Sequence, residues 1–203
     1  MTATTGADGV VRCPWAAAGE YARYHDEEWG VPLHGDAALF EKLSLEGFQS
    51  GLSWIVVLRK RPAFRAAFAG FEPERVAGFG EHDVERLLTD AGIVRNRQKI
   101  EAVLGNARAV AALRDREGDG ALDRLIWSHA PEPRDERDRP TGMGDVPAST
   151  PESVALAKAL KREGLRFVGP VTVYALMQSA GLVDDHVAGC WCARPGARSD
   201  ARL

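Results

Sequence analysis

The chain has 203 residues, of which 45% are hydrophobic and 27% charged, and its formal net charge is −3. These values are typical of a globular protein with one domain or two small lobes, and the net charge neither requires nor excludes a nucleic-acid partner. No apolar run approaches the ~20 residues that span a bilayer, and the N-terminus lacks a signal-peptide pattern. The three scattered cysteines are too few for a disulfide framework, so we expect a protein of the reducing cytosol.

Apolar residues recur at helical spacing along the chain without sustained strand alternation, which predicts an all-α protein. Residues 1–11 are expected to form a disordered tail, and residues 13–35 an irregular, packed loop that is rich in Trp, Tyr, Pro and Gly. Asp36 can cap a helix that continues through Leu45. The sequence therefore predicts an irregular N-terminal segment that is followed by a helix.

Caps and prolines predict the remaining helices. Ser53 can cap a short helix over residues 54–61, and Pro62 and Pro73 each suit the first turn of a further helix. Further helices are expected over residues 81–90, 96–118, 121–128, 150–164 and 170–181. Residues 130–150 are rich in proline and charge, and are expected to form a mobile surface connection.

Residues near both ends of the chain form a candidate metal site. They are Cys13, His25, His186 and Cys190. His186 and Cys190 are four positions apart, so both point the same way from a helix or tight turn, whereas Cys13 and His25 form a looser pair. Two thiolates and two imidazoles suit tetrahedral zinc and leave no open position for catalysis. Two unrelated half-sites are the alternative, and spacing alone leaves both interpretations open.

A helix, a tight glycine-containing turn and a second helix are predicted between Glu152 and Gly181. The turn, residues 167–170, leaves backbone N–H groups at the start of a helix free to meet a phosphate. Basic residues surround it, namely Lys158, Lys161, Arg162 and Arg166. The alternative is an ordinary helical hairpin with a solvated basic face.

A second cluster of interest runs from Glu46 to Trp54. Glu46 directly follows an apolar helical run, with Phe48 and Trp54 close by, so its carboxylate could lie in an aromatic pocket. A buried carboxylate is costly unless a cation or donors face it, and a glutamate in water at a helix end is the alternative. Further aromatic residues lie beside the candidate metal ligands, where core packing is the alternative role: Trp15, Tyr21, Tyr24 and Trp29.

Several motifs together resemble the DNA-3-methyladenine glycosylase I family of helix-hairpin-helix DNA glycosylases. They are RCPWA, YHDEEWGVP, LEGFQSGLSW, DAGIVRNRQKI and FVGPVTVYALMQSAGLVDDHVAGC. The resemblance implies one all-α glycosylase domain over residues 12–192, with two helical lobes around a base pocket and a C-terminal tail over residues 193–203. It also implies a structural zinc that joins the terminal segments through Cys13, His25, His186 and Cys190.

The resemblance assigns further roles residue by residue. Glu46 falls on the base-recognising carboxylate, and Tyr24 and Trp54 on the aromatic residues that hold the extruded base. Tyr21 and Trp15 are second-rank members of the pocket. The phosphate-contacting turn falls on Phe167, Val168 and Gly169, with Lys161 and Arg166 as neighbouring cations.

Two positions bear on the chemistry. Asp184 falls on the aspartate with which related glycosylases stabilise the developing sugar cation, and capping a turn beside His186 is its alternative role. Glu46 and Asp184 are therefore the candidate catalytic residues. Val171 stands where strand-cutting relatives carry a lysine, so no Schiff-base nucleophile is expected. Phe48 stands where other members can have a polar residue, which affects the expected base preference.

The implied activity is that of a monofunctional base-excision repair enzyme, acting as a monomer. It would hydrolyse the N-glycosidic bond of N3-methylated adenine flipped out of alkylation-damaged double-stranded DNA, and leave an abasic site. The methylated base is cationic and its bond is already weakened, so recognition needs a carboxylate acceptor and π faces. The alternative is a zinc-stapled helical DNA-binding module without activity, and an RNA or nucleotide hydrolase finds no specific support in the sequence.

Overall fold

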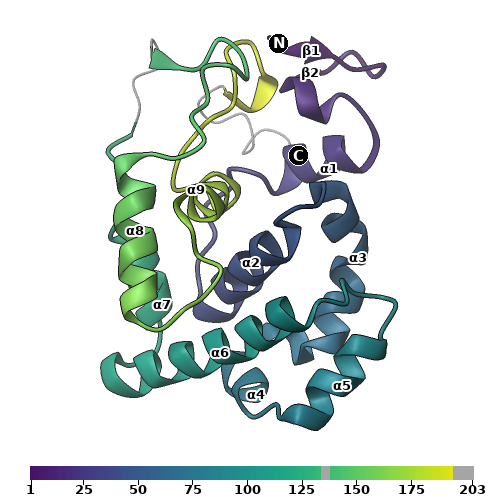
Figure 1. Ribbon diagram of the computed structural model, residues 1–203. Coiled ribbons are helices and arrows are strands. Elements are labelled where there is room, and N and C mark those ends of the chain that lie inside the picture. The colour runs from purple at the N-terminus through teal and green to yellow at the C-terminus, as the bar shows by residue number, and fades with distance from the viewer. Residues whose placement is uncertain (134–137, 194–203) are drawn as a thin grey trace. The chain divides into compact units, whose positions relative to one another are not determined.

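The computed structural model describes residues 1–133 and 138–193, which form two compact units. Unit 1 comprises Met1–Pro32, Pro131–Ala148 and Met177–Leu203, and unit 2 comprises Leu33–Ala130 and Ser149–Leu176. Part of the predicted mobile connection, residues 134–137, and nearly all of the predicted C-terminal tail, residues 194–203, lie outside the description. Each unit is built from segments that are far apart in the sequence (Figure 1).

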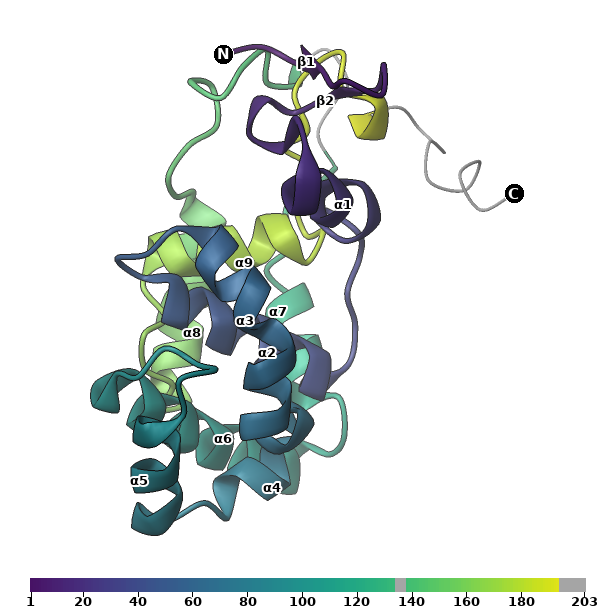
Figure 2. The ribbon, with the colours of Figure 1, turned by 90° about the vertical axis from the view of Figure 1, so that its right-hand side faces the viewer.

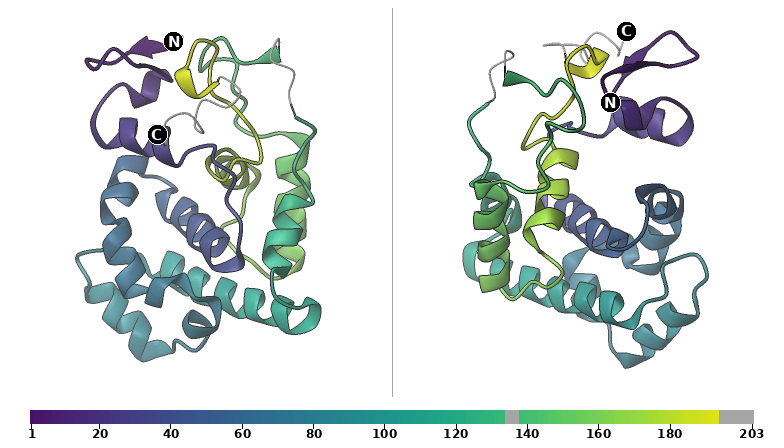
Figure 3. Two further views of the ribbon diagram at one scale, coloured as in Figure 1. Left: turned by 180° about the vertical axis from the view of Figure 1, so that it is seen from behind. Right: turned by 45° about the horizontal axis from the view of Figure 1, so that its top comes forward.

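Unit 1 begins with a two-stranded antiparallel hairpin, in which β1 (Thr4–Thr5) pairs with β2 (Val11–Arg12). The sequence predicts a disordered tail here, but Asp8 in the turn accepts hydrogen bonds from the Val10 N–H and from the Arg12 guanidinium. These contacts join the turn to the second strand and account for the ordered hairpin. The short 3₁₀ helix η4 (Trp191–Ala193) near the other end of the described chain contacts β2 (Figure 3).

The 3₁₀ helix η1 (Pro14–Ala16) and helix α1 (Gly19–Glu27) follow the hairpin. The sequence predicts an irregular loop at α1, whereas the structure forms a helix of nine residues. Its inward-facing side includes Tyr24 and His25, which are both buried. Because these are aromatic and polar residues rather than aliphatic ones, the helical period of α1 is weak in the sequence.

Unit 2 is built from helices (Figures 1 and 2). Aromatic side chains pack against one another in its core. The helices are α2 (Asp36–Gln49), α3 (Trp54–Ala67), η2 (Ala69–Phe71), α4 (Pro73–Ala77), α5 (Glu81–Thr89), α6 (Arg97–Glu117), α7 (Ala121–Trp127), α8 (Pro151–Arg162) and the first part of α9 (Pro170–Ser179). Helix α2 contacts α3, α6 and α7, and α6 also contacts α4 and α5. The all-α fold class predicted from the sequence is confirmed.

Two details of unit 2 differ from the sequence prediction. Helix α3 continues through Pro62, although a proline removes one helical hydrogen bond. Val57 and Phe64, on either side of the proline, are both buried, so the buried face of the helix continues past it. Asp36 begins α2 but caps another helix, because its carboxylate accepts the backbone N–H groups of Gly120 and Asp123 at the start of α7.

Two further helices of unit 2 are capped by side chains. The Asn96 side chain accepts the N–H of Lys99 at the start of α6, and Thr150 forms a capping box with Ser153 at the start of α8. Among the helices of residues 1–133 and 138–193, none is both long and apolar enough to cross a membrane.

Candidate functional site

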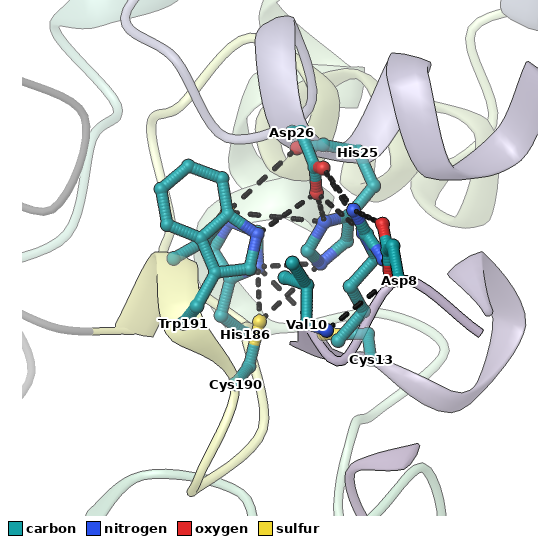
Figure 4. A network of polar contacts seen from close by, with 10 residues as sticks. Asp8, Val10, Cys13, His25, Asp26, His186, Cys190 and Trp191 are labelled. Carbon is teal, nitrogen blue, oxygen red and sulfur yellow. Dashed lines mark hydrogen bonds and ion pairs between the residues drawn. The ribbon is translucent and has the colours of Figure 1, made fainter. Parts of the chain in front are cut away.

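The four predicted metal ligands come together inside unit 1 (Figure 4). Cys13 immediately precedes η1, His25 lies on α1, and His186 and Cys190 lie in the segment between α9 and η4. All four side chains are buried, and one donor atom from each lies within 4.8 Å of the others. This arrangement joins the two ends of the chain and excludes the alternative of two unrelated half-sites.

The distances define which ring nitrogens face the centre of the group. His25 Nε2 lies 3.2 Å from His186 Nδ1 and 3.4 Å from Cys190 Sγ. His186 Nδ1 lies 3.6 Å from Cys13 Sγ and 3.7 Å from Cys190 Sγ. One imidazole therefore presents Nε2 to the centre, whereas the other presents Nδ1.

The electrostatics of the cluster favour a bound cation. The neighbouring Cys190 and burial together raise the pKa of the Cys13 thiol, whereas the thiols of Cys13 and Cys192 lower the pKa of Cys190. Burial lowers the pKa of His186 and so favours the neutral imidazole, which is the metal-binding form. One thiol is thus held back from ionising by its neighbour, and a metal ion would stabilise both thiolates. The group is able to hold a metal.

Three residues that the sequence reasoning does not single out surround His25. Asp26 Oδ1 lies 2.8 Å from His25 Nδ1, and it accepts hydrogen bonds from Trp191 Nε1 at 2.9 Å and from Arg12 Nε at 3.0 Å. Although burial raises the pKa of Asp26, the hydrogen bonds from Arg12, His25 and Trp191 outweigh it and lower the pKa below its ordinary value. The sequence signal that could have revealed this group is a carboxylate directly after a candidate histidine ligand.

Trp15 lies at the centre of an aromatic cluster in unit 1. Its ring centroid lies 5.8 Å from that of Tyr21, 6.3 Å from Tyr24 and 5.1 Å from Trp29. Trp15 also makes an edge contact with the His25 ring at 5.3 Å. The structure thus brings together the three aromatic pocket candidates of unit 1, and Trp15 additionally covers a metal ligand.

Glu46 is buried on α2, with only 5% of its surface exposed, so the alternative of a glutamate in water is wrong. Lys42 is also buried and precedes Glu46 by four residues, which places both on one face of α2, where opposite charges can interact. The Lys42 ammonium lies 5.9 Å from the centroid of the Trp54 ring, at the start of α3. Glu46 and Trp54 belong to unit 2 and Tyr24 to unit 1, so their shared pocket stays a prediction.

Phe48, which follows on the same helix, belongs to the core. It is 1% exposed, and its ring centroid lies 4.6 Å from that of Phe64 and 5.8 Å from that of Phe68. Its contacts are those of a packing residue of unit 2. An effect of this side chain on base preference therefore has no support in these contacts.

Asp184 makes the contacts expected of its alternative role. Its Oδ1 accepts the backbone N–H of His186 at 3.1 Å, which closes a turn beside this metal ligand. Its Oδ2 forms an ion pair with Arg139 at 2.8 Å. The carboxylate is therefore held by a cation and a backbone donor, while its side chain remains 48% exposed.

The predicted hairpin lies between α8 and α9 (Figure 1). Asn106 of α6 binds the residue before the turn, since its Oδ1 accepts the Arg166 N–H and its Nδ2 donates to the Arg166 carbonyl. Phe167 is 41% exposed and has a positive φ of 57°, which is uncommon outside glycine, whereas Val168 is buried. The cations Lys158, Lys161, Arg162 and Arg166 are exposed on this segment.

A second, weaker basic patch at Arg97 and Lys99 is also conceivable from the sequence, but the contacts do not support it. Arg97 forms ion pairs with Glu81, Glu85 and Glu101, so its surroundings are acidic overall. Lys99 donates to the backbone carbonyls of Phe48 and Ser50 at 2.9 and 2.6 Å. Both side chains thus serve the structure of unit 2.

The fold and the buried Cys₂His₂ group define a helical protein whose terminal segments meet at a metal-binding group. Residues 15–193 match the sequence profile of the methyladenine glycosylase family. The DNA-3-methyladenine glycosylase 1 of Escherichia coli K12 is 48% identical over 185 residues, which cover 89% of this chain and 96% of that protein. The chain therefore belongs to the methyladenine glycosylase family, as its motifs predict.

Solved structures agree with this assignment. A crystal structure of 3-methyladenine DNA glycosylase I has a TM-score of 0.83 and 46% identity, and the match covers 89% of this chain and 98% of that one. A single-residue variant of 3-methyladenine DNA glycosylase I, solved in complex with 3-methyladenine, has a TM-score of 0.80 and 35% identity. That match covers 88% of this chain and 95% of the variant.

Proposed function

We propose that this chain is a monofunctional DNA glycosylase that removes 3-methyladenine from alkylation-damaged double-stranded DNA during base-excision repair. The family match over residues 15–193 carries this conclusion. It is supported by a DNA-3-methyladenine glycosylase that this chain matches over nearly the full length of both proteins. The enzyme class follows from family membership: the chain is a DNA-3-methyladenine glycosylase, as the sequence predicts. A related enzyme in complex with 3-methyladenine supports the choice of base.

We assign base recognition to Glu46, Tyr24 and Trp54. Methylation at N3 makes adenine cationic, so a desolvated carboxylate and aromatic faces favour it over the neutral normal base. The burial of Glu46 supports this role, because removal from water strengthens its interaction with a cation. Tyr21 and Trp15 are second-rank members of the pocket, and the packing of Trp15 against both tyrosines is consistent with a supporting role.

The reaction proposed is hydrolysis of the N-glycosidic bond, which leaves an abasic site in an intact strand. Strand cutting by this fold needs an amine that attacks the sugar, and the hairpin helix has Val171 at that position. Asp184 can stabilise positive charge on the sugar, but Arg139 already balances part of its charge, and the His186 backbone holds its other oxygen. We therefore give Asp184 a helpful and not an essential role.

Zinc is the metal that the ligand set fits best. Neighbouring donor atoms around tetrahedral zinc lie about 3.3–3.8 Å apart, given the usual zinc–nitrogen and zinc–sulfur bond lengths. Four of the six pairs of donor atoms among Cys13, His25, His186 and Cys190 lie 3.2–3.7 Å apart, and all six pairs lie within 4.8 Å. With four protein ligands such a metal has no open position, so it would stabilise the joined chain ends and leave the reaction to other residues. Thiolate ligands also favour the reducing cytosol.

We place the DNA-binding face at the hairpin, through the backbone of Phe167, Val168 and Gly169 and the side chains of Lys161 and Arg166. The exposure of both cations supports this placement. Each lost phosphate contact should reduce the salt dependence of binding by about one unit of slope. Lys161→Glu with Arg166→Glu should therefore flatten the slope, and an unchanged slope would move the face elsewhere.

The competing interpretation is a DNA-binding module without activity, which would share the metal and the hairpin. Incubation with N-methylated duplex DNA, followed by identification of the freed base, separates the two. We expect 3-methyladenine in solution and no release from unmethylated duplex. Tight binding without release would instead support the binding module. We expect the enzyme to act as a monomer.

A further inference from the structure

The carboxylate of Asp26 lies directly behind the candidate metal ligand His25 (Figure 4). Its Oδ1 lies 2.8 Å from His25 Nδ1, while Nε2 on the other side of the same ring faces Cys190 and His186. The imidazole thus bridges a carboxylate and the ligand group. Carboxylates in this position are known to orient metal-binding histidines in general and to raise the basicity of the ring.

The surroundings of Asp26 determine the direction of this hydrogen bond. Arg12 binds both of its oxygens, with Nε at 3.0 Å from each and a terminal nitrogen at 2.7 Å from Oδ2. The Trp191 indole N–H donates to Oδ1 at 2.9 Å. A carboxylate held in an ion pair of this kind only accepts hydrogen bonds, so His25 Nδ1 must carry the proton. His25 Nε2 then has its lone pair directed toward the metal group.

The N-terminal hairpin extends the network. Arg12 lies on β2 and is 5% exposed, so its charge needs partners. Besides Asp26 it binds both oxygens of Asp8, in the turn between the strands, at 2.9 and 2.8 Å. The hairpin therefore fixes Arg12, Arg12 fixes Asp26, and Asp26 fixes the ring of His25.

A second metal site at the same place is the competing interpretation, because His25, Asp26 and Cys192 also lie close enough to share an ion. The Arg12 guanidinium already occupies the carboxylate with a positive charge, and it would repel a second cation. Trp191 takes a further acceptor position on Asp26. The contacts therefore favour orientation of His25 over a second ion.

We propose that Asp26, held by Arg12 and Trp191, is a positioning residue that fixes the protonated nitrogen and the ring orientation of His25 for zinc binding. This inference rests on the proposed zinc site, and it links the contact between β2 and η4 to the metal group, because Arg12 of β2 and Trp191 of η4 both bind Asp26. It assigns to the segment before Cys13 a part in metal binding. Asp26 does not itself bind the metal.

The test is the zinc affinity of purified full-length variants, measured by competition with a chromogenic chelator. Asp26→Ala should weaken zinc binding by about 10–100-fold, as is usual when the partner of a metal-binding histidine is lost. Asp26→Asn should weaken it less, since the amide oxygen can still accept from Nδ1. Trp191→Phe, which removes one donor to Asp26, should cause a smaller loss in the same direction.

Asp123→Ala is the matched control, because Asp123 also contacts a histidine Nδ1, that of His34 at 3.0 Å, but both of these residues belong to unit 2, whereas the candidate metal ligands belong to unit 1. The zinc affinity of the Asp123→Ala protein should equal that of the wild type. The absorption spectrum of the Co²⁺-substituted protein adds a readout of ligand geometry, which should change in Asp26→Ala and remain in Asp123→Ala.

The outcomes separate this inference from the zinc proposal. Stoichiometric zinc in the wild type, with equally tight binding in Asp26→Ala, would overturn the role of Asp26 and leave the zinc site intact. Wild-type protein without zinc would overturn both. If Asp26→Ala does not fold, wild-type zinc affinity and an unchanged Co²⁺ spectrum in both Asp26→Asn and Trp191→Phe would overturn the inference.

Discussion

Asn106 and Arg166 are joined by two hydrogen bonds between one side-chain amide and one peptide backbone. Asn106 Oδ1 accepts the Arg166 N–H at 2.7 Å, and Nδ2 donates to the Arg166 carbonyl at 3.0 Å. The next residue, Phe167, has a φ of 57°. A buried residue of α6 thus fixes the chain where it enters the hairpin, just before a backbone conformation that non-glycine residues rarely adopt.

Replacement of Asn106 should therefore affect both stability and DNA binding. Asn106→Ala leaves the Arg166 backbone without its partners, and we expect a loss of about 1–3 kcal/mol in the free energy of unfolding. Weaker duplex binding should accompany it, because the hairpin is less well fixed. Asn106→Asp keeps the acceptor for the Arg166 N–H but sets a buried carboxylate oxygen against the Arg166 carbonyl, so it should not restore the lost stability. Urea unfolding and a binding titration measure the two effects, and an Asn106→Ala protein of unchanged stability would contradict the account.

Metal removal should destabilise the protein through unit 1. We expect one zinc per chain by elemental analysis, and a chelator should lower the melting temperature, because a structural metal contributes directly to folding. Cys190→Ser should have the same effect. Cys192→Ser is the control, since Cys192 lies beside the group without being one of its four members, and its Sγ is 3.8 Å from His25 Nδ1, the nitrogen that does not face the other ligands. Equal melting temperatures of wild type and Cys190→Ser would argue against the site.

Glu46→Gln keeps the shape of the side chain and removes its charge. We expect the activation free energy of 3-methyladenine excision to rise by about 1–3 kcal/mol, the range for a hydrogen bond to a charged group. Trp54→Ala and Tyr24→Ala should each lose base stacking worth about 1–3 kcal/mol. Single-turnover rates on methylated duplex measure these effects.

Phe48→Leu is the control for this series. Phe48 packs against Phe64 in the core, so this variant should unfold more easily. The protein that remains folded should excise 3-methyladenine at the wild-type rate. Wild-type rates in Glu46→Gln, Trp54→Ala and Tyr24→Ala alike would remove the pocket assignment.

A pH-dependent contribution to stability is expected from Asp83. Its carboxylate accepts the Gly80 N–H at the start of α5, and this bond, with the nearby Arg86, lowers the pKa of Asp83 below 3.8. A lowered pKa means that the contribution is complete above pH 3.8 and is lost as the pH falls through the folded-state value. Charge at a helix start is typically worth about 0.3–1 kcal/mol.

Asp83→Asn should therefore be less stable than wild type at pH 6, and the difference should shrink as the pH falls below 4. Thermal unfolding of both proteins across this range makes the comparison, with the difference between them reported at each pH. A difference that stays constant down to the lowest pH would show that the charge of Asp83 contributes nothing.

The sequence predicts the helices of unit 2 well because their caps and apolar spacing are local signals. The helices predicted over residues 96–118 and 150–164 are present, and the side chains of Asn96 and Thr150 cap them. The N-terminal hairpin and α1 were not predictable in this way. Their order depends on Arg12 reaching two carboxylates and on His25 meeting residues near the other end of the chain. Such long-range contacts leave no periodic pattern in the sequence.

In the candidate site too, local motifs identify residues, whereas their contacts become known only from the fold. The ligands Cys13 and His186 could be named from residue type and motif, yet only the fold shows which nitrogen of His186 faces the thiols. Lys42 gives no sequence signal beyond a lysine in a helix, although it is buried one turn from Glu46. For Asp184 the motif indicates chemistry, whereas its contacts are those of a turn cap and an ion pair.

The most direct test of the central claim counts freed base and broken strands in the same reaction on N3-methyladenine-containing duplex DNA. Wild-type protein should release 3-methyladenine, and the strand should stay intact until alkali cleaves the abasic site. Asp184→Asn should release the base more slowly, and borohydride should trap no protein–DNA adduct, since the hairpin offers Val171 and no amine. Bound duplex without freed base, or strand breaks that appear together with the base before alkali is added, would contradict the account.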